Sequence, residues 1–325
     1  MRKRWFALGF AALTGAVLFC LNTSLFAHPD GQMRLLAHRG VHQRYDTAGL
    51  DNETCTATRI FEPTNAFIEN TLPSMRAAFD AGADMVEIDV HPTTDGEFAV
   101  FHDWTLDCRT DGEGVTREHS MAELRALDVG YGYTADGGTT FPFRGHGASL
   151  MPTLREVLTA FPDRAFLINF KSRDPSEGDA MSAYLEATPE LDMSRLAFFG
   201  AAPATRLREL RPDARIVSRR GLKQCGLRYL AIGWFGAIPD QCRNTLVFVP
   251  VNYAPLMWGW PNRFLTRMRA AGSEVYIAGP ISLRGPLTST GVDDAQTFAH
   301  VPRGWRGGVS TDAIEVVGPL AAESP

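Results

Sequence analysis

The stretch Gly82-Ala83-Asp84-Met85-Val86-Glu87-Ile88-Asp89-Val90 carries the most information about the fold of this chain. It opens with a glycine suited to the end of a helix and continues as a largely apolar run, which is typical of a parallel strand buried on both faces. Because side chains alternate along a strand, Glu87 and Asp89 point to one side and the apolar residues between them point to the other. Two buried carboxylates repel each other unless a cation compensates them, and Mg²⁺ or Ca²⁺ prefers oxygen ligands of this kind.

Similar short apolar runs recur along the chain, with helical patterns between several of them. The expected strands are Met33–His38, Met85–His91, Phe98–His102, Ala165–Lys171, Leu196–Gly200, Ala214–Ser218, Thr245–Val249, Glu274–Ala278 and Gly308–Thr311. The expected helices are Leu72–Ala81, Met121–Leu127, Thr153–Phe161, Pro203–Leu210 and Asn262–Ala271. This alternation predicts an α/β fold with a parallel sheet. Eight or nine strands fit a TIM (β/α)8 barrel better than a dinucleotide-binding fold, since no Gly-x-Gly-x-x-Gly follows the first strand.

The amino terminus indicates the compartment. Three basic residues, at positions 2–4, precede the run Trp5–Ala27, which contains no charged residue. The run has the length of a membrane-spanning helix and exceeds the apolar part of an ordinary signal peptide. It therefore favours a hydrophobic helix in residues 1–27 that anchors the protein in a membrane, with a cleaved signal peptide as the alternative. Either way, the rest of the chain, residues 28–325, is expected outside the cytoplasm, in the periplasm or at the cell surface.

The chain has five cysteines. Cys20 lies in the apolar run, and the other four are an even number in a compartment that permits disulfides. Cys225 and Cys242 bracket one short segment and are expected to pair, which leaves Cys55 to pair with Cys108. Four reduced thiols are the alternative.

Composition and charge exclude several classes of protein. The 325 residues include 32 Lys and Arg and 37 Asp and Glu, which gives a net charge of −5, and no basic block is present. We therefore expect no nucleic-acid partner. With 45% hydrophobic and 21% charged residues, the chain is neither disordered nor a multi-span membrane protein. Nothing in the sequence implies a protein partner.

Polar side chains gather where four of the expected strands end. His38 and Arg39 end the first, the carboxylate pair lies on the second, His102 ends the third, and Asn169 and Lys171 interrupt the fourth. Each histidine alone, and Asn169 alone, is more often structural than functional. Either carboxylate alone forms a buried salt bridge with Arg39 or Lys171 about as often as it binds a metal. Together, on successive strands of one barrel, they would be costly to bury without mutual compensation or a ligand. A site that binds a divalent cation and an anion is the simplest explanation for this group of residues.

The residues of these clusters, and the order of the clusters along the chain, resemble the motifs of the glycerophosphodiester phosphodiesterase family. The resemblance is dense from Leu35 to Lys171 and thin afterwards. Its motifs are Ala37-His38-Arg39-Gly40, Glu69-Asn70-Thr71, Gly82 to Val90, Thr94-Asp95-Gly96, His102-Asp103-Trp104-Thr105-Leu106-Asp107, Met151-Pro152-Thr153-Leu154-Arg155-Glu156-Val157-Leu158 and, late in the chain, Gly308-Val309-Ser310-Thr311-Asp312.

The resemblance implies a barrel of the phospholipase-C-like phosphodiesterase type. Such an enzyme hydrolyses glycerophosphodiesters, its small-molecule substrates, to glycerol 3-phosphate and an alcohol with the help of a divalent cation. His38 and His102 would be the general acid and base, and Arg39 and Lys171 would hold the phosphate oxygens. Imidazole suits the first role because its pKa lies near the working pH.

The metal ligands implied by the resemblance are Glu87 and Asp89, with Glu69 in or just outside the first shell. The family usually has a glutamate where this chain has Asn169. An amide oxygen still coordinates Mg²⁺ or Ca²⁺ but adds no negative charge, so we expect weaker metal binding or a changed preference. Asp312, at the end of the last strand, is a candidate to orient a site residue.

Two other functions stay open at this level. A phospholipase-D-like enzyme or a lyase acting on intact lipids would suit the anchor and the aromatic loop that contains Trp258 and Trp260. A non-catalytic binding module for a phosphorylated ligand would explain Asn169 as the mark of a decayed metal site. The presence of both His38 and His102 argues against a binding module, which needs no acid–base pair.

Overall fold

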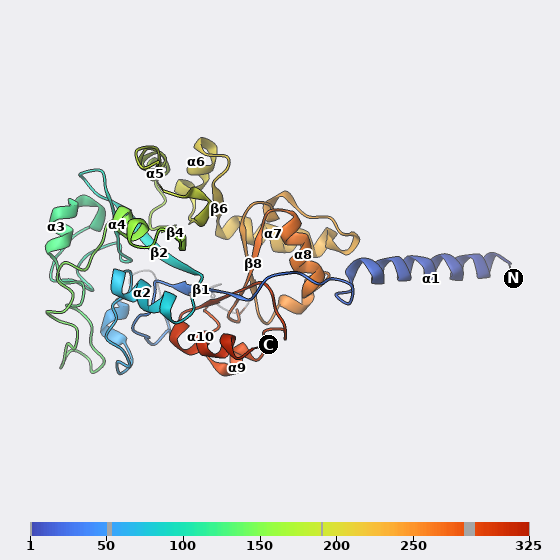
Figure 1. Cartoon of the computed structure of the whole chain (residues 1–325), viewed down its shortest axis with the longest axis horizontal. Coiled ribbons are helices and arrows are strands. Elements are labelled where there is room, and N and C mark those ends of the chain that lie inside the picture. The colour runs from blue at the N-terminus through green and yellow to red at the C-terminus, as the bar shows by residue number, and fades with distance from the viewer. Residues whose placement is uncertain (1, 51–53, 190, 283–289, 325) are drawn as a thin grey trace.

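A nearly closed TIM barrel forms the body of the protein, as the sequence predicts (Figure 1). The structure is a computed structural model that describes residues 2–50, 54–189, 191–282 and 290–324. Its eight parallel strands run in the order β6-β5-β4-β2-β1-β9-β8-β7. They are β1 (Arg34–His38), β2 (Met85–Pro92), β4 (Ala165–Phe170), β5 (Leu196–Phe199), β6 (Arg215–Val217), β7 (Leu246–Pro250), β8 (Glu274–Ala278) and β9 (Gly308–Thr311).

The seam of the barrel lies between β6 and β7, the two ends of this path. There, the hydroxyl of Thr245, just before β7, donates a hydrogen bond to the carbonyl oxygen of Ile216 in β6 at 2.7 Å. A side chain thus spans the gap where the backbone ladder is interrupted.

One predicted strand lies outside the barrel. β3 (Phe98–Val100) pairs antiparallel with the end of β2, with Val90 opposite Val100. A tight turn causes this reversal, because Gly96 has a positive φ of 85° and the amide of Thr93 donates to the carbonyl oxygen of Glu97 at 2.9 Å. The prediction that the site groups lie on successive barrel strands was therefore wrong for His102, which lies in the loop after β3.

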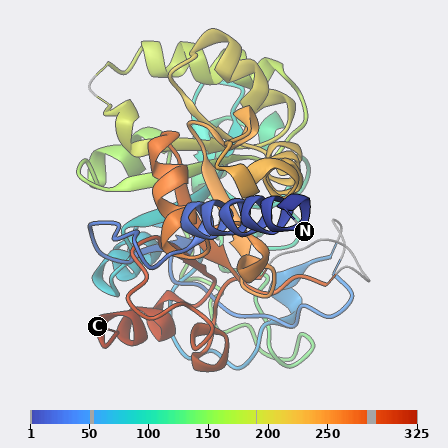
Figure 2. The same ribbon diagram turned by 90° about the vertical axis from the view of Figure 1, so that its right-hand side faces the viewer.

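Helices cover the barrel, with α5 and α6 on one side and α9 and α10 on the opposite side (Figures 1 and 2). The five predicted helices are present, each within one residue at either end. The helices of the body are α2 (Leu72–Asp80), α3 (Met121–Ala126), α4 (Leu154–Ala160), α5 (Ser176–Glu186), α6 (Ala202–Leu210), α7 (Arg219–Ile232), α8 (Asn262–Ala270), α9 (Ala295–Phe298) and α10 (Ile314–Ala322).

Four of these helices were missing from the sequence-based prediction, namely α5, α7, α9 and α10. The helix α7 contains Gly221 and Gly226, and α10 contains Pro319 in its interior. Both residue types weaken the helical signal of a sequence, and packing against the barrel overrides them here.

The strand alternation predicted from the sequence positions the site. Inside the barrel, apolar side chains from β1, β2 and β4 form one layer, which includes Leu36, Met85 and Leu167. Two residues further along each strand, the same inward direction is taken by a polar residue: His38, Glu87 and Asn169 respectively. The register brings His38 opposite Glu87 and Asp89 opposite Asn169. The polar residues therefore lie at the carboxyl ends of the strands, where barrel sites are found.

Both predicted disulfides are confirmed. Cys55 is bonded to Cys108 and Cys225 to Cys242, while Cys20 is free and exposed. The first bridge is half-buried and joins the loop after β1 to the segment between β3 and α4, and the second is buried. The segments joined by the first bridge share a separate apolar cluster, which includes Ala57, Leu106, Leu124, Val129 and Tyr133.

The amino-terminal helix α1 (Arg2–Asn22) projects from the body of the protein (Figures 1 and 2). Side chains hold the last turn of α1 and the chain just after it. Arg267 donates to the carbonyl oxygen of Leu21 at 2.8 Å, and Ser24 donates to the carbonyl oxygen of Gly259 at 2.9 Å. Among the residues that the structure describes, none of the helices combines the length and apolar character that a membrane span requires. The division into residues 1–27 and 28–325 stays a prediction.

Candidate active site

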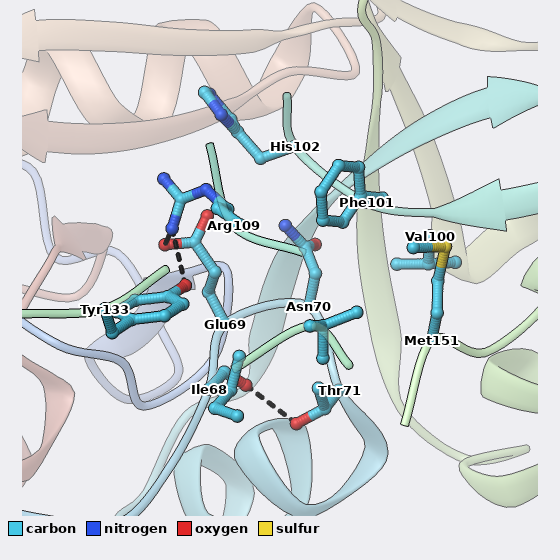
Figure 3. Close-up of a pocket in the computed structure, with 11 residues that line it drawn as sticks. Ile68, Glu69, Asn70, Thr71, Val100, Phe101, His102, Arg109, Tyr133 and Met151 are labelled. Carbon is cyan, nitrogen blue, oxygen red and sulfur yellow. Dashed lines mark hydrogen bonds and ion pairs between the residues drawn. The ribbon is translucent and has the colours of Figure 1, made fainter. Parts of the chain in front are cut away.

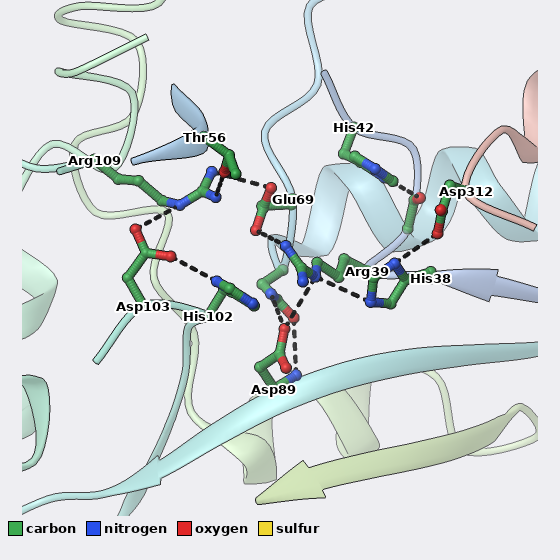
Figure 4. Close-up of polar contacts among 12 residues, drawn as sticks. His38, Arg39, His42, Thr56, Glu69, Asp89, His102, Asp103, Arg109 and Asp312 are labelled. Carbon is green, nitrogen blue, oxygen red and sulfur yellow. Dashed lines mark hydrogen bonds and ion pairs between the residues drawn. The ribbon is translucent and has the colours of Figure 1, made fainter. Parts of the chain in front are cut away.

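The first histidine of the site, His38, is paired with Asp312. The strand β1 ends at His38 and β9 ends one residue before Asp312, and these parallel neighbours bring His38 Nδ1 to 2.6 Å from Asp312 Oδ1 (Figure 4). Burial and the adjacent Arg39 disfavour the imidazolium, but the carboxylates of Asp312 and Glu87 outweigh them and raise the pKa of His38. The contact with Asp312 fits the orienting role predicted for that residue.

Arg39 lies at the centre of the site. Its Nη1 is 3.0 Å from Glu69 Oε1 and its Nε is 3.3 Å from Asp89 Oδ2. The backbone bends sharply here, since Arg39 and Asn70 have positive φ values of 63° and 59° and the amide of Asn70 donates to the carbonyl oxygen of Arg39 at 3.0 Å. Non-glycine residues rarely adopt this conformation, and such backbone strain is characteristic of functional sites.

The two carboxylates of β2 differ in their surroundings. Asp89 is fully buried and both of its oxygens are engaged: Oδ1 by Asn169 at 2.9 Å and Lys171 at 3.3 Å, and Oδ2 by Asn70 at 3.0 Å. Burial alone would raise the pKa of Asp89, but the charge of Lys171, followed by those of His102 and Arg39, holds it well below its usual range. Burial, followed by repulsion from Asp89, instead raises the pKa of Glu87 to about 7.

Glu87 is also where the site has an unused ligand atom. Its Oε2 is buried and accepts no hydrogen bond from the described residues. The nearest cationic group is the ring of His38, whose Nε2 lies 3.6 Å from this oxygen, beyond hydrogen-bond distance. A buried carboxylate oxygen without a hydrogen bond, beside a second carboxylate and the amide of Asn169, is chemically suited to a divalent cation. In the described parts of the chain, no three histidine, cysteine, aspartate or glutamate side chains are grouped so that they would hold a metal ion. The protein thus offers two carboxylates and one amide.

The second histidine, His102, is paired with its neighbour Asp103. His102 Nδ1 lies 2.5 Å from Asp103 Oδ1. Burial, and after it the charges of Arg39 and Lys171, lower the pKa of His102 to about 4, although Asp103 acts in the opposite direction. His102 is therefore neutral at neutral pH.

Sequence reasoning did not single out Arg109. Its guanidinium group is 2% exposed and joins Glu69 to Asp103, with Nη1 at 3.0 Å from Glu69 Oε2 and Nε at 2.8 Å from Asp103 Oδ2. Burial alone would raise the pKa of Glu69, but Arg109 and Arg39 lower it to about 2. The signal in the sequence was the position of Arg109 directly after Cys108, two residues beyond the motif His102 to Asp107.

A small cavity opens between these groups (Figure 3). Its lining includes Glu69, Asn70, His102, Arg109 and Tyr133. The residues predicted for the site come from three strands, β1, β2 and β4, and from the loops after β1, β3, β4 and β9, and they lie at the carboxyl end of the barrel. Of these residues, Glu69 and His102 line the cavity. This geometry defines a TIM-barrel protein with two histidine–aspartate pairs beside cations that suit an anionic ligand.

Residues 38–196 match the family described as the glycerophosphoryl diester phosphodiesterase family. The match confirms the family expected from the motifs.

Relatives with assigned names resemble part of the chain. A glycerophosphodiester phosphodiesterase of Caldanaerobacter subterraneus is 36% identical over 103 residues, which cover 32% of this chain and 39% of that protein. One from Bacillus subtilis is 33% identical over 114 residues, covering 34% of this chain and 38% of its own length. The match therefore spans about two fifths of the length of these relatives.

Solved structures share the fold over most of the chain. The glycerophosphoryl diester phosphodiesterase domain of an uncharacterised protein from Mycobacterium tuberculosis aligns with a TM-score of 0.61 at 18% identity, covering 90% of this chain and 99% of that one. A phosphodiesterase from Oleispira antarctica, in complex with the product sn-glycerol-3-phosphate, aligns with a TM-score of 0.53 at 18% identity, covering 90% and 98%. At these identities the likeness establishes the fold.

Proposed function

We propose that this protein is a phosphodiesterase that hydrolyses small glycerophosphodiesters to glycerol 3-phosphate and an alcohol. The observation that carries the proposal is the presence of two histidine–carboxylate pairs, His38 with Asp312 and His102 with Asp103, on either side of Arg39 (Figure 4). A module that only binds phosphate would need the cation but not two oriented imidazoles. The names of the sequence relatives and the product bound to the Oleispira antarctica phosphodiesterase support the same substrate class.

The two histidines have opposite roles in this proposal. His102, with a pKa of about 4, is neutral and accepts the proton of the attacking hydroxyl group. His38, whose pKa Asp312 and Glu87 raise, is the proposed donor of the proton that passes to the oxygen of the leaving alcohol as the ester bond to phosphorus breaks. Pairs of titratable groups whose pKa values are pushed apart are typical acid–base partners. The attacking hydroxyl belongs to water or to the neighbouring glycerol carbon, and in the second case water then opens the cyclic phosphate.

Cations near the histidines would neutralise the phosphate group. Arg39 and Lys171 both lie beside Asp89 and are the groups proposed to contact the phosphate oxygens. Glu87, Asp89 and Asn169 would hold a divalent cation, which when bound would add positive charge where negative charge develops on the phosphoryl group. Mg²⁺ and Ca²⁺ both fit oxygen ligands of this kind.

Metal binding can be measured apart from activity. We expect Asn169→Glu to bind Mg²⁺ or Ca²⁺ more tightly than the wild type, on the order of tenfold, because it adds a third carboxylate. Isothermal titration calorimetry of both proteins measures this difference, with Gln296→Glu, which adds the same charge at an exposed position, as the control. Equal affinities in wild type and Asn169→Glu would show that residue 169 is not a ligand.

Hydrolysis is tested with a panel of glycerophosphodiesters and intact phospholipids, with and without a chelator. We expect glycerol 3-phosphate as product, loss of turnover in His38→Ala, and unchanged turnover in His300→Ala, whose histidine is exposed. Cleavage of intact lipids alone would favour the lipid-hydrolysing or lyase alternative. Binding of glycerol 3-phosphate without any turnover would favour a binding module. Turnover that is insensitive to both the chelator and the loss of His38 would exclude the mechanism.

We also propose that the barrel works outside the cytoplasm and that its amino-terminal segment directs it there. The two disulfides support this location because cytoplasmic thiols are kept reduced. Fractionation and the mass of the mature protein test the segment. A full-length protein in the membrane fraction supports an anchor, a protein lacking about 27 residues supports a cleaved signal, and a full-length cytoplasmic protein contradicts both.

A further inference from the structure

The buried Arg109 binds partners from several segments of the chain. Besides its ion pairs with Glu69 and Asp103, it donates from Nη1 to the hydroxyl of Tyr133 and from Nη2 to the hydroxyl of Thr56, both at 2.5 Å. These four groups come from the loop after β1, the loop after β3 and the segment between α3 and α4. Burial of a cation costs free energy unless well-placed hydrogen bonds and ion pairs compensate it. Here Nε, Nη1 and Nη2 of the planar guanidinium group all have partners.

Asp103 transmits this arrangement to His102. One oxygen of the Asp103 carboxylate faces Arg109 Nε at 2.8 Å and the other faces His102 Nδ1 at 2.5 Å (Figure 4). A carboxylate held at one oxygen presents the other in a fixed direction. The imidazole paired with it therefore has a fixed ring orientation, with Nδ1 protonated and Nε2 free to accept a proton.

A disulfide next to Arg109 in the sequence holds its backbone in place. Cys108 directly precedes Arg109, and its bonded partner Cys55 directly precedes Thr56, which accepts from Arg109. The bridge has a Cα–Cα distance of 5.5 Å and a sequence separation of 53 residues. The backbone around Arg109 is also tightly enclosed, since a Cβ atom on Gly132 would lie 1.9 Å from the carbonyl oxygen of Cys108.

We propose that Arg109 is a positioning residue for His102, acting through Asp103, and that the Cys55–Cys108 disulfide keeps Arg109 in place. The inference rests on the proposed function for its catalytic consequence, but the orientation of His102 is a structural property that can be observed without turnover. Glu69 binds both Arg109 and Arg39. The disulfide that holds Arg109 therefore also supports the part of the site around Arg39.

The first experiment compares Arg109→Lys and Arg109→Met with the wild type. Lysine keeps the charge but cannot bind two carboxylates with a planar fork. We expect kcat to fall on the order of 10- to 100-fold in Arg109→Met, to recover in part in Arg109→Lys, and KM to change less than kcat. The control, Arg206→Met, removes an exposed ion pair with Asp179 and should leave kcat and KM unchanged. Wild-type kcat in a folded Arg109→Met would overturn the proposal.

The second experiment needs no catalysis. Nitrogen-15 NMR of the histidine rings, with the His102 signals identified by their absence in His102→Gln, reports which ring nitrogen carries the proton. We expect Nδ1–H in the wild type and in Arg206→Met, and a mixture of tautomers in Arg109→Met. An unchanged tautomer in Arg109→Met would overturn the positioning role even if the protein is an active phosphodiesterase. A changed tautomer in a protein without turnover would support it while the proposed function fails.

The third experiment tests the disulfide against its counterpart. We expect the double substitution Cys55→Ser with Cys108→Ser to lower kcat and disturb the His102 signal, as Arg109→Met does. The matched substitution Cys225→Ser with Cys242→Ser, which removes the buried bridge, should change neither in the folded protein. Where the first double variant does not fold, Thr56→Val keeps the bridge and removes one hydrogen bond to Arg109. An unaltered His102 signal in the folded variant without Cys55 and Cys108 would overturn the role of the bridge. An unaltered signal in Thr56→Val would overturn the hydrogen bond by which the bridged segment is proposed to hold Arg109.

Discussion

Individual residues of the site owe their ionisation to the fold rather than to their neighbours in sequence. Asp103 alone would favour a charged His102, yet burial and the cations Arg39 and Lys171 dominate and lower the pKa of His102 to about 4. In the unfolded chain the same histidine titrates near pH 6.5. Between these two values the unfolded state binds a proton that the folded state does not.

The free energy of unfolding should therefore fall as the pH falls through the window from about 6.5 to about 4. The contribution of His102 is at most about 1.4 kcal/mol per pH unit, because one proton is involved. Urea unfolding of wild type and His102→Gln at several pH values measures it, and we expect the variant to have a weaker pH dependence in this window only. Parallel pH dependences would contradict the low pKa of His102.

Gly40 is a residue whose backbone conformation the site requires. It has a φ of 83°, and a Cβ atom there would lie 2.2 Å from Ser74 Oγ and 2.8 Å from the Ser74 carbonyl carbon. Gly96 has a similar φ of 85°, but a Cβ atom there would meet nothing within 4 Å. The two positions separate the cost of the backbone conformation from the cost of crowding.

We expect Gly96→Ala to destabilise the protein by about 1 kcal/mol and Gly40→Ala by about 3 kcal/mol or more. The larger effect arises because backbone atoms of α2 would have to move. Urea unfolding of both variants measures the difference. Equal losses of stability would mean that Ser74 gives way without cost.

At the scale of elements, capping fixes where helices begin near the site. The helix α4 follows directly on Thr153, whose side chain accepts from the amide of Glu156, while the Glu156 side chain accepts from the amide of Thr153. The same reciprocal arrangement joins Ser120 to Glu123 at the start of α3. The helices expected from the sequence pattern, Met121–Leu127 and Thr153–Phe161, begin within one residue of these capped starts.

Thr153→Ala should lower the free energy of unfolding by about 1 kcal/mol, because the amide of Glu156 loses its acceptor. Thr153→Ser keeps the oxygen atom and should cost much less. Thermal and urea unfolding of the two variants check this difference. If serine and alanine destabilise equally, packing of the threonine methyl group rather than capping is responsible.

At the scale of the whole molecule, two disulfides cross-link the chain at separations of 53 and 17 residues. By loop-closure entropy such bridges contribute about 4 and about 3 kcal/mol. Small domains are stable by only about 5–15 kcal/mol in total, so the bridges are a large fraction of the stability of this barrel.

Reduction should consequently lower the melting temperature of the protein markedly. Thermal unfolding with and without a phosphine reductant measures the shift, and the variant with all four bridge cysteines changed to serine should show no shift. A wild-type melting temperature that is unaffected after complete reduction, verified by mass, would contradict a stabilising role of the bridges.

Much of the fold of this protein can be predicted from its sequence because its strands are buried on both faces. Continuous apolar runs such as those of β4 and β7 carry a strong local signal, and polar interruptions at Glu87, Asp89 and Asn169 stand out against it. The motifs around His38 and His102 likewise place polar residues directly after apolar strands, and this pattern makes the family resemblance visible in the sequence. By contrast, α7 is long but weakly patterned, because only Cys225 and Tyr229 on it are buried.

The sequence by itself thus determined the barrel class, the strands that carry the site, the two histidines and the pairing of the cysteines. Only the tertiary structure decided that β3 leaves the barrel, that Asp312 faces His38, and that Arg109 joins Glu69 to Asp103. The physical reason is the range of the interactions. Strand alternation and capping act between near neighbours, whereas the contacts of Arg109 and Asp312 bring together residues 40 and 274 positions apart in the chain.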